Sequence, residues 1–94
     1  MKLLVTGNIT KGFASWVKMQ DGLASEMEKV GIKLIWAGTN PDESEVFAVV
    51  QMEDPAQMKT FGEREDVAKL RAEAGVDVAS TTVISPIGEH YMPA

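Results

Sequence analysis

The side chains of this chain that are best suited to chemistry are few and lie far apart. His90 is the one histidine, and histidine is the side chain whose unperturbed pKa lies closest to neutral pH. With Tyr91 beside it, His90 is a candidate general base. Asn8 ends an expected strand and is positioned to project toward a cleft between a helix and the sheet. These three residues are the predicted catalytic candidates.

Each of the three also has a structural explanation. His90 and Tyr91 belong to a tail that follows turn-forming residues, and chain ends are where disorder and tolerance to change concentrate. They reach a site only if the tail folds back over a pocket or onto a partner subunit. Asn8 is of a residue type that commonly ties off a turn. A catalytic role and a purely structural role therefore remain alternatives for each of these three residues.

The two tryptophans are the predicted ligand-binding residues. Trp16 lies on the apolar stripe of an expected helix, so core packing also explains it. Trp36 lies in an apolar strand, where tryptophan suits a core, an interface or a ligand site. The ligand that these positions favour is a small apolar metabolite between helices and sheet.

Several classes of function are disfavoured by what the chain lacks. It has no cysteine, which removes thiolate metal sites and thiol nucleophiles. The net charge of −5 and the scattered basic residues disfavour nucleic-acid binding. The sequence contains none of the motifs of a nucleotide-binding loop, a nucleophile elbow (Gly-x-Ser-x-Gly) or a zinc-binding His-Glu-x-x-His helix. We expect no metal, no cofactor and no membrane span of roughly 20 apolar residues, and a cytoplasmic protein.

Two groups of acidic residues resemble cation ligands only superficially. They lack the ordered ligand spacing of a calcium loop, so a solvated loop and a solvated helix junction explain them better. The first group lies in an expected turn and the second interrupts an expected helix; they comprise Asp42, Glu43 and Glu45, and Glu63, Glu65 and Asp66.

Local signals divide the chain into alternating strands and helices. Residues 2–9 read as a strand, and Thr10 is the expected N-cap of the helix that follows. Apolar residues then recur at helical spacing from Phe13 to Val30, and Gly31 is the expected left-handed C-cap. Two strands, at 32–37 and 46–50, are joined by turn-forming residues 38–44.

The second half repeats this order. Asp54 is the expected N-cap of a second helix with a proline at its first position. Its apolar spacing is interrupted by Gly62 and the acidic block, so the helix is expected to be broken and to end at Gly75. Its inner face is expected to carry Met58, Phe61, Val67, Leu70 and Ala74. A last strand is expected over about 76–84.

The resulting order, β-α-β-β-α-β, predicts one domain over residues 1–94 of the α+β class. In this ferredoxin-like arrangement two helices lie on one face of a four-stranded antiparallel sheet. Strand alternation places Leu34 and Trp36 on one face and Ile35 and Ala37 on the other. Because both faces of the strand are apolar and helices cover only one, we expect a homodimer through the open sheet face.

Small proteins with this order, a bare apolar sheet face and an aromatic-bearing first helix resemble the dimeric α+β barrel superfamily. The resemblance is carried by the element order and, locally, by Phe13-Ala14-Ser15-Trp16-Val17, Gly31-Ile32-Lys33 and Ser80-Thr81-Thr82-Val83-Ile84-Ser85, which look like an uncharacterised family within it. It implies a dimer whose two sheets pack face to face.

The functions found in that superfamily are diverse. It includes cofactor-independent monooxygenases, muconolactone isomerases, haem-handling enzymes and stress-response barrels. Some members use an asparagine and a tryptophan, the haem-degrading ones together with a histidine. The second helix here has no histidine, so the haem-degrading set is incomplete. The resemblance therefore supports the dimer without transferring an activity.

Three functional hypotheses follow. The leading one is a homodimer that binds a small apolar metabolite between its helices and sheet. The alternative is a cofactor-independent monooxygenase or small isomerase acting on an aromatic or polyketide-like compound, with Asn8, Trp36, His90 and Tyr91 as the residues to test. The third is a ligand-sensing module that acts through a separate partner.

Overall fold

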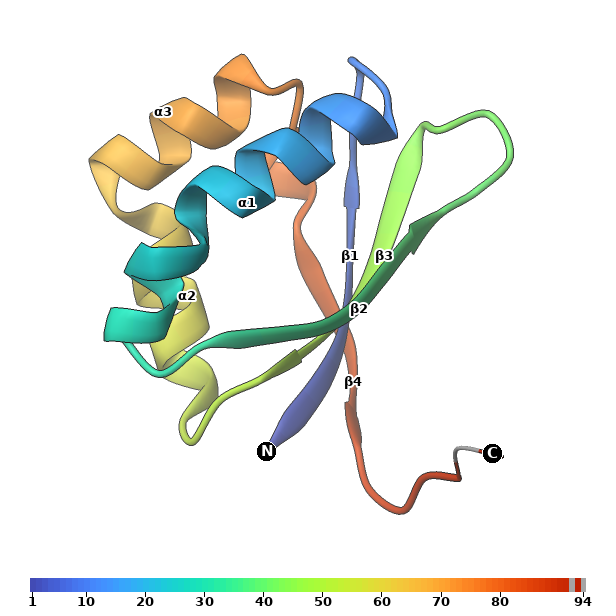
Figure 1. Ribbon diagram of the computed structural model, residues 1–94, viewed down its shortest axis with the longest axis vertical. Helices are drawn as coiled ribbons and strands as arrows, with labels where there is room; N and C mark the ends of the chain where they lie inside the picture. Colours follow the sequence, from blue (N-terminus) through green and yellow to red (C-terminus); the bar gives the residue numbers. More distant parts are fainter. Residues whose placement is uncertain (92, 94) are drawn as a thin grey trace.

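The computed structural model describes residues 1–91 and 93, and it contains one sheet with the helices on one side of it (Figure 1). The predicted order β-α-β-β-α-β is confirmed, with the second helix in two pieces. The elements are β1 (Lys2–Asn8), α1 (Phe13–Lys29), β2 (Lys33–Thr39), β3 (Glu45–Gln51), α2 (Pro55–Glu63), α3 (Glu65–Glu73), the 3₁₀ turn η1 (Val78–Ser80) and β4 (Thr82–Ile87).

The sheet has four strands in the order β2-β3-β1-β4, and every neighbouring pair is antiparallel. In the central pair Leu3 lies opposite Val50 and Val5 opposite Ala48. All four of these residues are buried, whereas their neighbours along each strand are half-buried or exposed. Directly opposed residues share a face, so this row is the face that the helices cover.

The first helix begins differently from the expectation. Thr10 does not cap it, because its hydroxyl donates to the carbonyl of Gly75 at 3.2 Å. The residue before the helix is Gly12, whose φ of 83° lies in the left-handed region that favours glycine. The free amide of Phe13 donates instead to Oε1 of Glu43, at 2.7 Å. A side chain from the β2–β3 loop therefore supplies the cap.

The second helix begins and breaks as predicted. Asp54 accepts a hydrogen bond from the amide of Ala56, and the side chain of Gln57 accepts one from the amide of Asp54. This reciprocal capping box satisfies amides that the first helical turn leaves free. At Arg64 the backbone turns to a ψ of 130°, which separates α2 from α3.

Arg64 then anchors that break to the rest of the protein. Its guanidinium contacts Asp66 at 2.7 Å and Glu26 of α1 at 3.3 Å. It also lies over the ring of Phe61, with 5.3 Å between the guanidinium carbon and the ring centroid. The junction of the two short helices is thereby attached to α1, which helps to set the distance between the helices.

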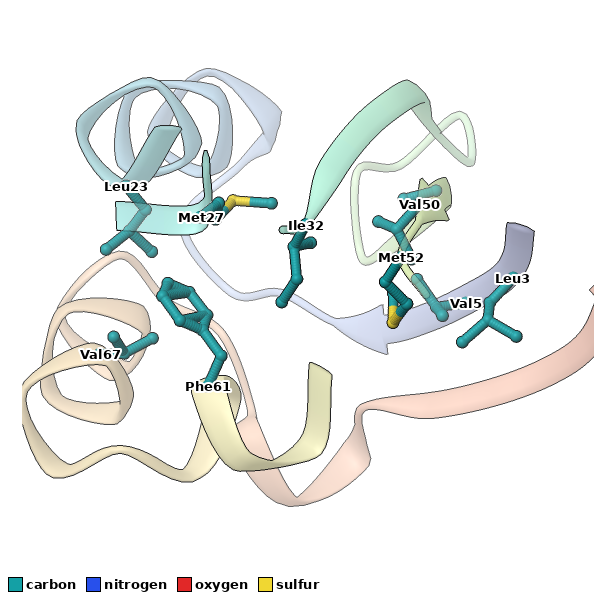
Figure 2. Packing of buried hydrophobic residues seen from close by; sticks show 10 residues of the cluster. Leu3, Val5, Leu23, Met27, Ile32, Val50, Met52, Phe61 and Val67 are labelled. Carbon is teal, nitrogen blue, oxygen red and sulfur yellow. The ribbon is translucent and has the colours of Figure 1, made fainter. Parts of the chain in front are cut away.

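The core joins the three helices to the covered face of the sheet (Figure 2). In the close-up, Leu23 of α1, Phe61 of α2 and Val67 of α3 point toward one another, and Met27 of α1 extends toward Ile32. The sheet and its flanking residues complete the cluster with Leu3, Val5, Ile32, Ala48, Val50 and Met52. Burial of apolar surface of this kind is the main source of stability in a small domain.

The last strand lies later in the chain than predicted. Residues 76–80 do not form it: Val76 makes an isolated bridge to Ile9, and the η1 turn follows. The amide of Asp77 donates to the carbonyl of Asn8, which draws the chain across the end of β1 before β4 begins. Pro86 lies within β4 rather than ending it. An edge strand tolerates proline because one side of its backbone needs no partner.

The prediction of which β2 side chains share a face is also wrong. Leu34 lies opposite Val50 but Trp36 lies opposite Val49, so one residue of β2, Ile35, is extra in the ladder. Such a β-bulge shifts the alternation by one position. Leu34 and Ala37 therefore pack against the core, whereas Trp36 faces away from it.

The face of the sheet without helices is apolar, as the sequence predicts. Trp36 is 57% exposed, Ile84 51% and Ile35 38%. The two central strands contribute half-buried apolar residues to the same face, which are Leu4 of β1 and Phe47 and Val49 of β3. No helix among the described residues is both long and apolar enough to cross a membrane.

Candidate ligand-binding cleft

A cleft of about 490 Å³ lies between the helices and the covered face of the sheet. Ligand pockets in proteins commonly have volumes of about 300–1,000 Å³. Val5, Ala48 and Val50 contribute from the sheet. The helices contribute Trp16, Met19 and Leu23 from α1, and Met58, Phe61 and Val67 from α2 and α3. The lining is therefore mostly apolar, and the elements that supply it lie far apart in the sequence.

A few polar groups interrupt this apolar lining. Its charged members are Lys59, Glu63 and Arg71, of which the first two are exposed at the surface. Arg71 is the one that burial affects, since desolvation lowers the pKa of its guanidinium. Arginine nevertheless remains protonated in proteins. A permanent positive charge thus lies at the side of an apolar cleft.

Two contacts hold the Arg71 guanidinium in place. Nη1 donates to the carbonyl of Gly62 at 3.4 Å, and Nη2 donates to Oγ1 of Thr81 at 2.5 Å. A side chain at Gly62 would crowd this arrangement, because its Cβ would lie 3.1 Å from Nη1. The guanidinium therefore connects the end of α2 with the segment that leads into β4.

Arg71 was not among the predicted site residues. The apolar spacing predicts Val67, Leu70 and Ala74 on the inner face of the helix, but Leu70 is 47% exposed. Residues four apart lie on one helical face, so the burial of Val67 carries Arg71 inward instead. The i, i+4 relation to Val67 was the signal that could have found it.

Of the predicted ligand-binding residues, Trp16 lies in the cleft. Its ring stacks on that of Phe13, with centroids 5.7 Å apart and planes 10° from parallel. Both rings pack against the small cluster of Ile9, Val46 and Val76. Trp16 is half-buried, so it serves the core and the cleft lining together.

Trp36 lies on the other side of the sheet and does not meet the cleft. Its ring covers Gly38, where an added Cβ would come within 2.7 Å of the indole. Glycine at this position allows the ring to lie flat against the strand. Trp16 and Trp36 are therefore separated by the sheet and do not form one site in a single chain.

Asn8, His90 and Tyr91 also fail to converge within one chain. Asn8 is exposed at the end of β1, where its backbone N–H donates to Oγ of Ser80. His90 and Tyr91 follow β4, whose last residue Ile87 lies opposite Lys2 at the other end of β1 (Figure 1). Six residues of strand span roughly 20 Å. Both tail residues are exposed, and neither lines the cleft.

The acidic residues of the first group, at the β2–β3 loop and the start of β3, make local structural contacts. Glu43 caps α1, and Glu45 accepts a hydrogen bond from the hydroxyl of Thr6 at 2.8 Å. Asp42 accepts one from the hydroxyl of Ser44, and this contact lowers the pKa of its carboxyl. Within residues 1–91 and 93, no group of three or more potential ligands is placed to hold a metal ion.

Comparison with solved structures shows the fold. The chain is similar to the crystal structure of L-rhamnose mutarotase from Formosa agariphila, with a TM-score of 0.57 and 15% sequence identity. The match covers 100% of this chain and 99% of that one. The chain has a ferredoxin-like fold, with the four-stranded antiparallel sheet and the element order that the sequence predicts. No family model matches the sequence, and no curated protein does.

Proposed function

We propose that this protein binds a small, largely apolar molecule in the cleft between its helices and its sheet. The observation that carries the proposal is the lining: aliphatic, aromatic and methionine side chains surround about 490 Å³ of space, with few polar groups among them. Pockets of this composition bind by burying apolar ligand surface, and a few polar groups orient the ligand. Trp16 of α1 and Met58 of α2 both line the cleft and would contact the ligand.

We further propose that the working unit is a homodimer joined through the open sheet face. The exposed Trp36, Ile35 and Ile84 form an apolar surface rimmed by polar strand ends. A two-fold axis lets one such surface cover its own copy. The resemblance of the element order to that of the dimeric α+β barrels supports the same arrangement. The cleft lies on the other side of the sheet, so ligand binding and assembly use separate surfaces.

Calorimetric titration of the full chain with 1-decanol tests the binding proposal. Val83 lies opposite the core residue Val5 and lines the cleft, so Val83→Trp places an indole into the space. The binding seen with the unmodified chain should weaken at least about tenfold in this variant. Ala72→Trp, at an exposed position of α3, is the matched control and should bind normally. No binding by the unmodified chain, or equal binding by Val83→Trp, contradicts the proposal.

A second candidate function is a small isomerase, which the fold favours over the other enzymatic possibilities. The similar structure is that of a mutarotase, an isomerase that acts on L-rhamnose. At 15% identity the likeness extends to the backbone, not to site residues. NMR exchange measurements on L-rhamnose give a direct test. Acceleration of anomer interconversion by catalytic amounts of the protein would support this candidate, and an unchanged rate would reject that substrate.

A further inference from the structure

The charge of Arg71 has no ionic partner among the residues described. Ion pairs within 4.0 Å involve Lys29, Arg64, Glu26 and Asp66, and none involves Arg71. Arg64, which is more exposed to solvent, contacts two carboxylates, whereas the more buried guanidinium contacts none. A charge removed from water without a partner is unfavourable. An anion beside the half-buried Arg71 would offset this cost.

The geometry of the guanidinium fits an incoming carboxylate. An arginine has five N–H donors, and the protein accepts from Nη1 and Nη2 once each, at Gly62 and Thr81. The contacts hold the planar group in one orientation and leave further donors for a ligand. No side-chain polar atom that is fully buried lacks a partner in the described part of the chain. Nε of Arg71 has no partner among the described residues, so it is not fully buried.

The charge of the lining sets the charge of the ligand. Lys59 and Glu63 are exposed and opposite in charge, which leaves the half-buried Arg71 as the net positive charge of a mostly apolar cleft. A monoanion balances that charge, whereas a doubly charged phosphate would leave an excess. The wider protein carries a net charge of −5, so a local cation is needed to attract an anion.

We propose that the molecule held in this cleft is an organic monocarboxylate, with its carboxylate bound by the Arg71 guanidinium beside Thr81 and its apolar body between helices and sheet. The inference rests on the proposed function and adds the chemical class of the ligand. Arginine forms charge-assisted, commonly bidentate bonds to carboxylates. Arg71 thus selects the head group, and Trp16, Met58 and their neighbours hold the body.

Calorimetry with decanoate and with 1-decanol separates the two parts of the proposal. Decanoate should bind at least about tenfold more tightly than the neutral alcohol. Arg71→Met should weaken decanoate binding about ten- to hundredfold, as expected for the loss of a charge-assisted hydrogen bond, and leave 1-decanol binding within about twofold. Lys69→Met removes the same charge from an exposed position on the same helix and should leave both affinities unchanged.

Each contrary result has a distinct meaning. Equal binding of decanoate and 1-decanol by the unmodified chain overturns the carboxylate proposal while the apolar cleft stands. No binding of either molecule overturns the proposed function itself. An equal loss in Lys69→Met shows general electrostatic attraction and removes Arg71 from the site. If Arg71→Met does not fold, Arg71→Lys decides: it keeps the charge without the planar fork, so decanoate affinity unchanged from the original chain overturns the assignment.

Discussion

Replacing Trp36 by alanine should weaken the proposed homodimer strongly. A tryptophan side chain buries up to about 250 Å², and Trp36 is 57% exposed, which leaves about 140 Å² for a partner to cover. At about 25 cal/mol per Å² this area is worth about 3.5 kcal/mol for each subunit. A symmetric dimer contains the residue twice, so the upper value is about 7 kcal/mol.

The measured loss should be smaller than this upper value. Alanine still buries part of the area, and ordering of side chains at the interface offsets some of the gain. Even about 3 kcal/mol raises the dissociation constant more than a hundredfold. The fold of the subunit should persist because the indole lies on the outer face of the sheet, over Gly38, rather than in the core.

Sedimentation equilibrium over a range of protein concentrations measures this effect. Leu70→Ala is the matched control, since Leu70 is an apolar residue 47% exposed on α3, away from the open sheet face. Its dissociation constant should equal that of the unmodified protein. A monomeric unmodified protein at about 100 μM, where even weak specific dimers form, would refute the reasoning. A dissociation constant for Trp36→Ala within twofold of the unmodified value would do the same.

Three further predictions concern the packing of Trp36, the cap of α1 and the ion pairs of Arg64. Gly38→Ala should displace the Trp36 ring, because the new Cβ would lie 2.7 Å from it. The fluorescence emission of Trp36, measured in a Trp16→Phe background, should therefore shift. An unchanged emission spectrum would contradict the packing of Trp36 over Gly38. Glu43→Ala should reduce the free energy of urea unfolding by about 1 kcal/mol through loss of the α1 cap, whereas Glu43→Gln, which keeps an acceptor, should lose less. Hydrogen bonds from Lys29 and then Arg64 lower the pKa of Glu26 below its ordinary 4.5, and one from Arg64 lowers the pKa of Asp66 below 3.8. These carboxylates therefore contribute stability above their unfolded pKa values and lose that contribution as pH falls through their folded pKa values. The free energy of unfolding measured in urea should therefore decline below about pH 4.5, and Arg64→Met should make this decline shallower.

Much of the fold could be read from local sequence signals. Asp54 and the proline after it define the start of α2, and Gly31, with a φ of 76°, ends α1. These signals work because capping and left-handed glycine conformations depend on residues a few positions apart. The apolar periodicity from Phe13 onward likewise reports a single helical face. The order of elements, and with it the fold, follows from these local terms.

The candidate site was predicted less completely. Trp16 lies in the cleft as expected, whereas Asn8 and the tail residues His90 and Tyr91 lie at opposite ends of β1 and outside it. Arg71 was missed because residue type alone does not distinguish an inward arginine from a solvated one. Its position beside the cleft is fixed by hydrogen bonds to Gly62 and Thr81, which local sequence signals do not reveal.

By itself, the sequence determined the succession of strands and helices, the helix ends and the existence of an apolar sheet face without helices. Only the tertiary structure decided that a bulge at Ile35 turns Trp36 outward, that Glu43 caps a helix thirty positions away and that Arg71 lies beside the cleft. The reason is physical. Local backbone preferences act over one or two turns of chain, whereas strand register, distant caps and the surroundings of a charge depend on which segments meet in space.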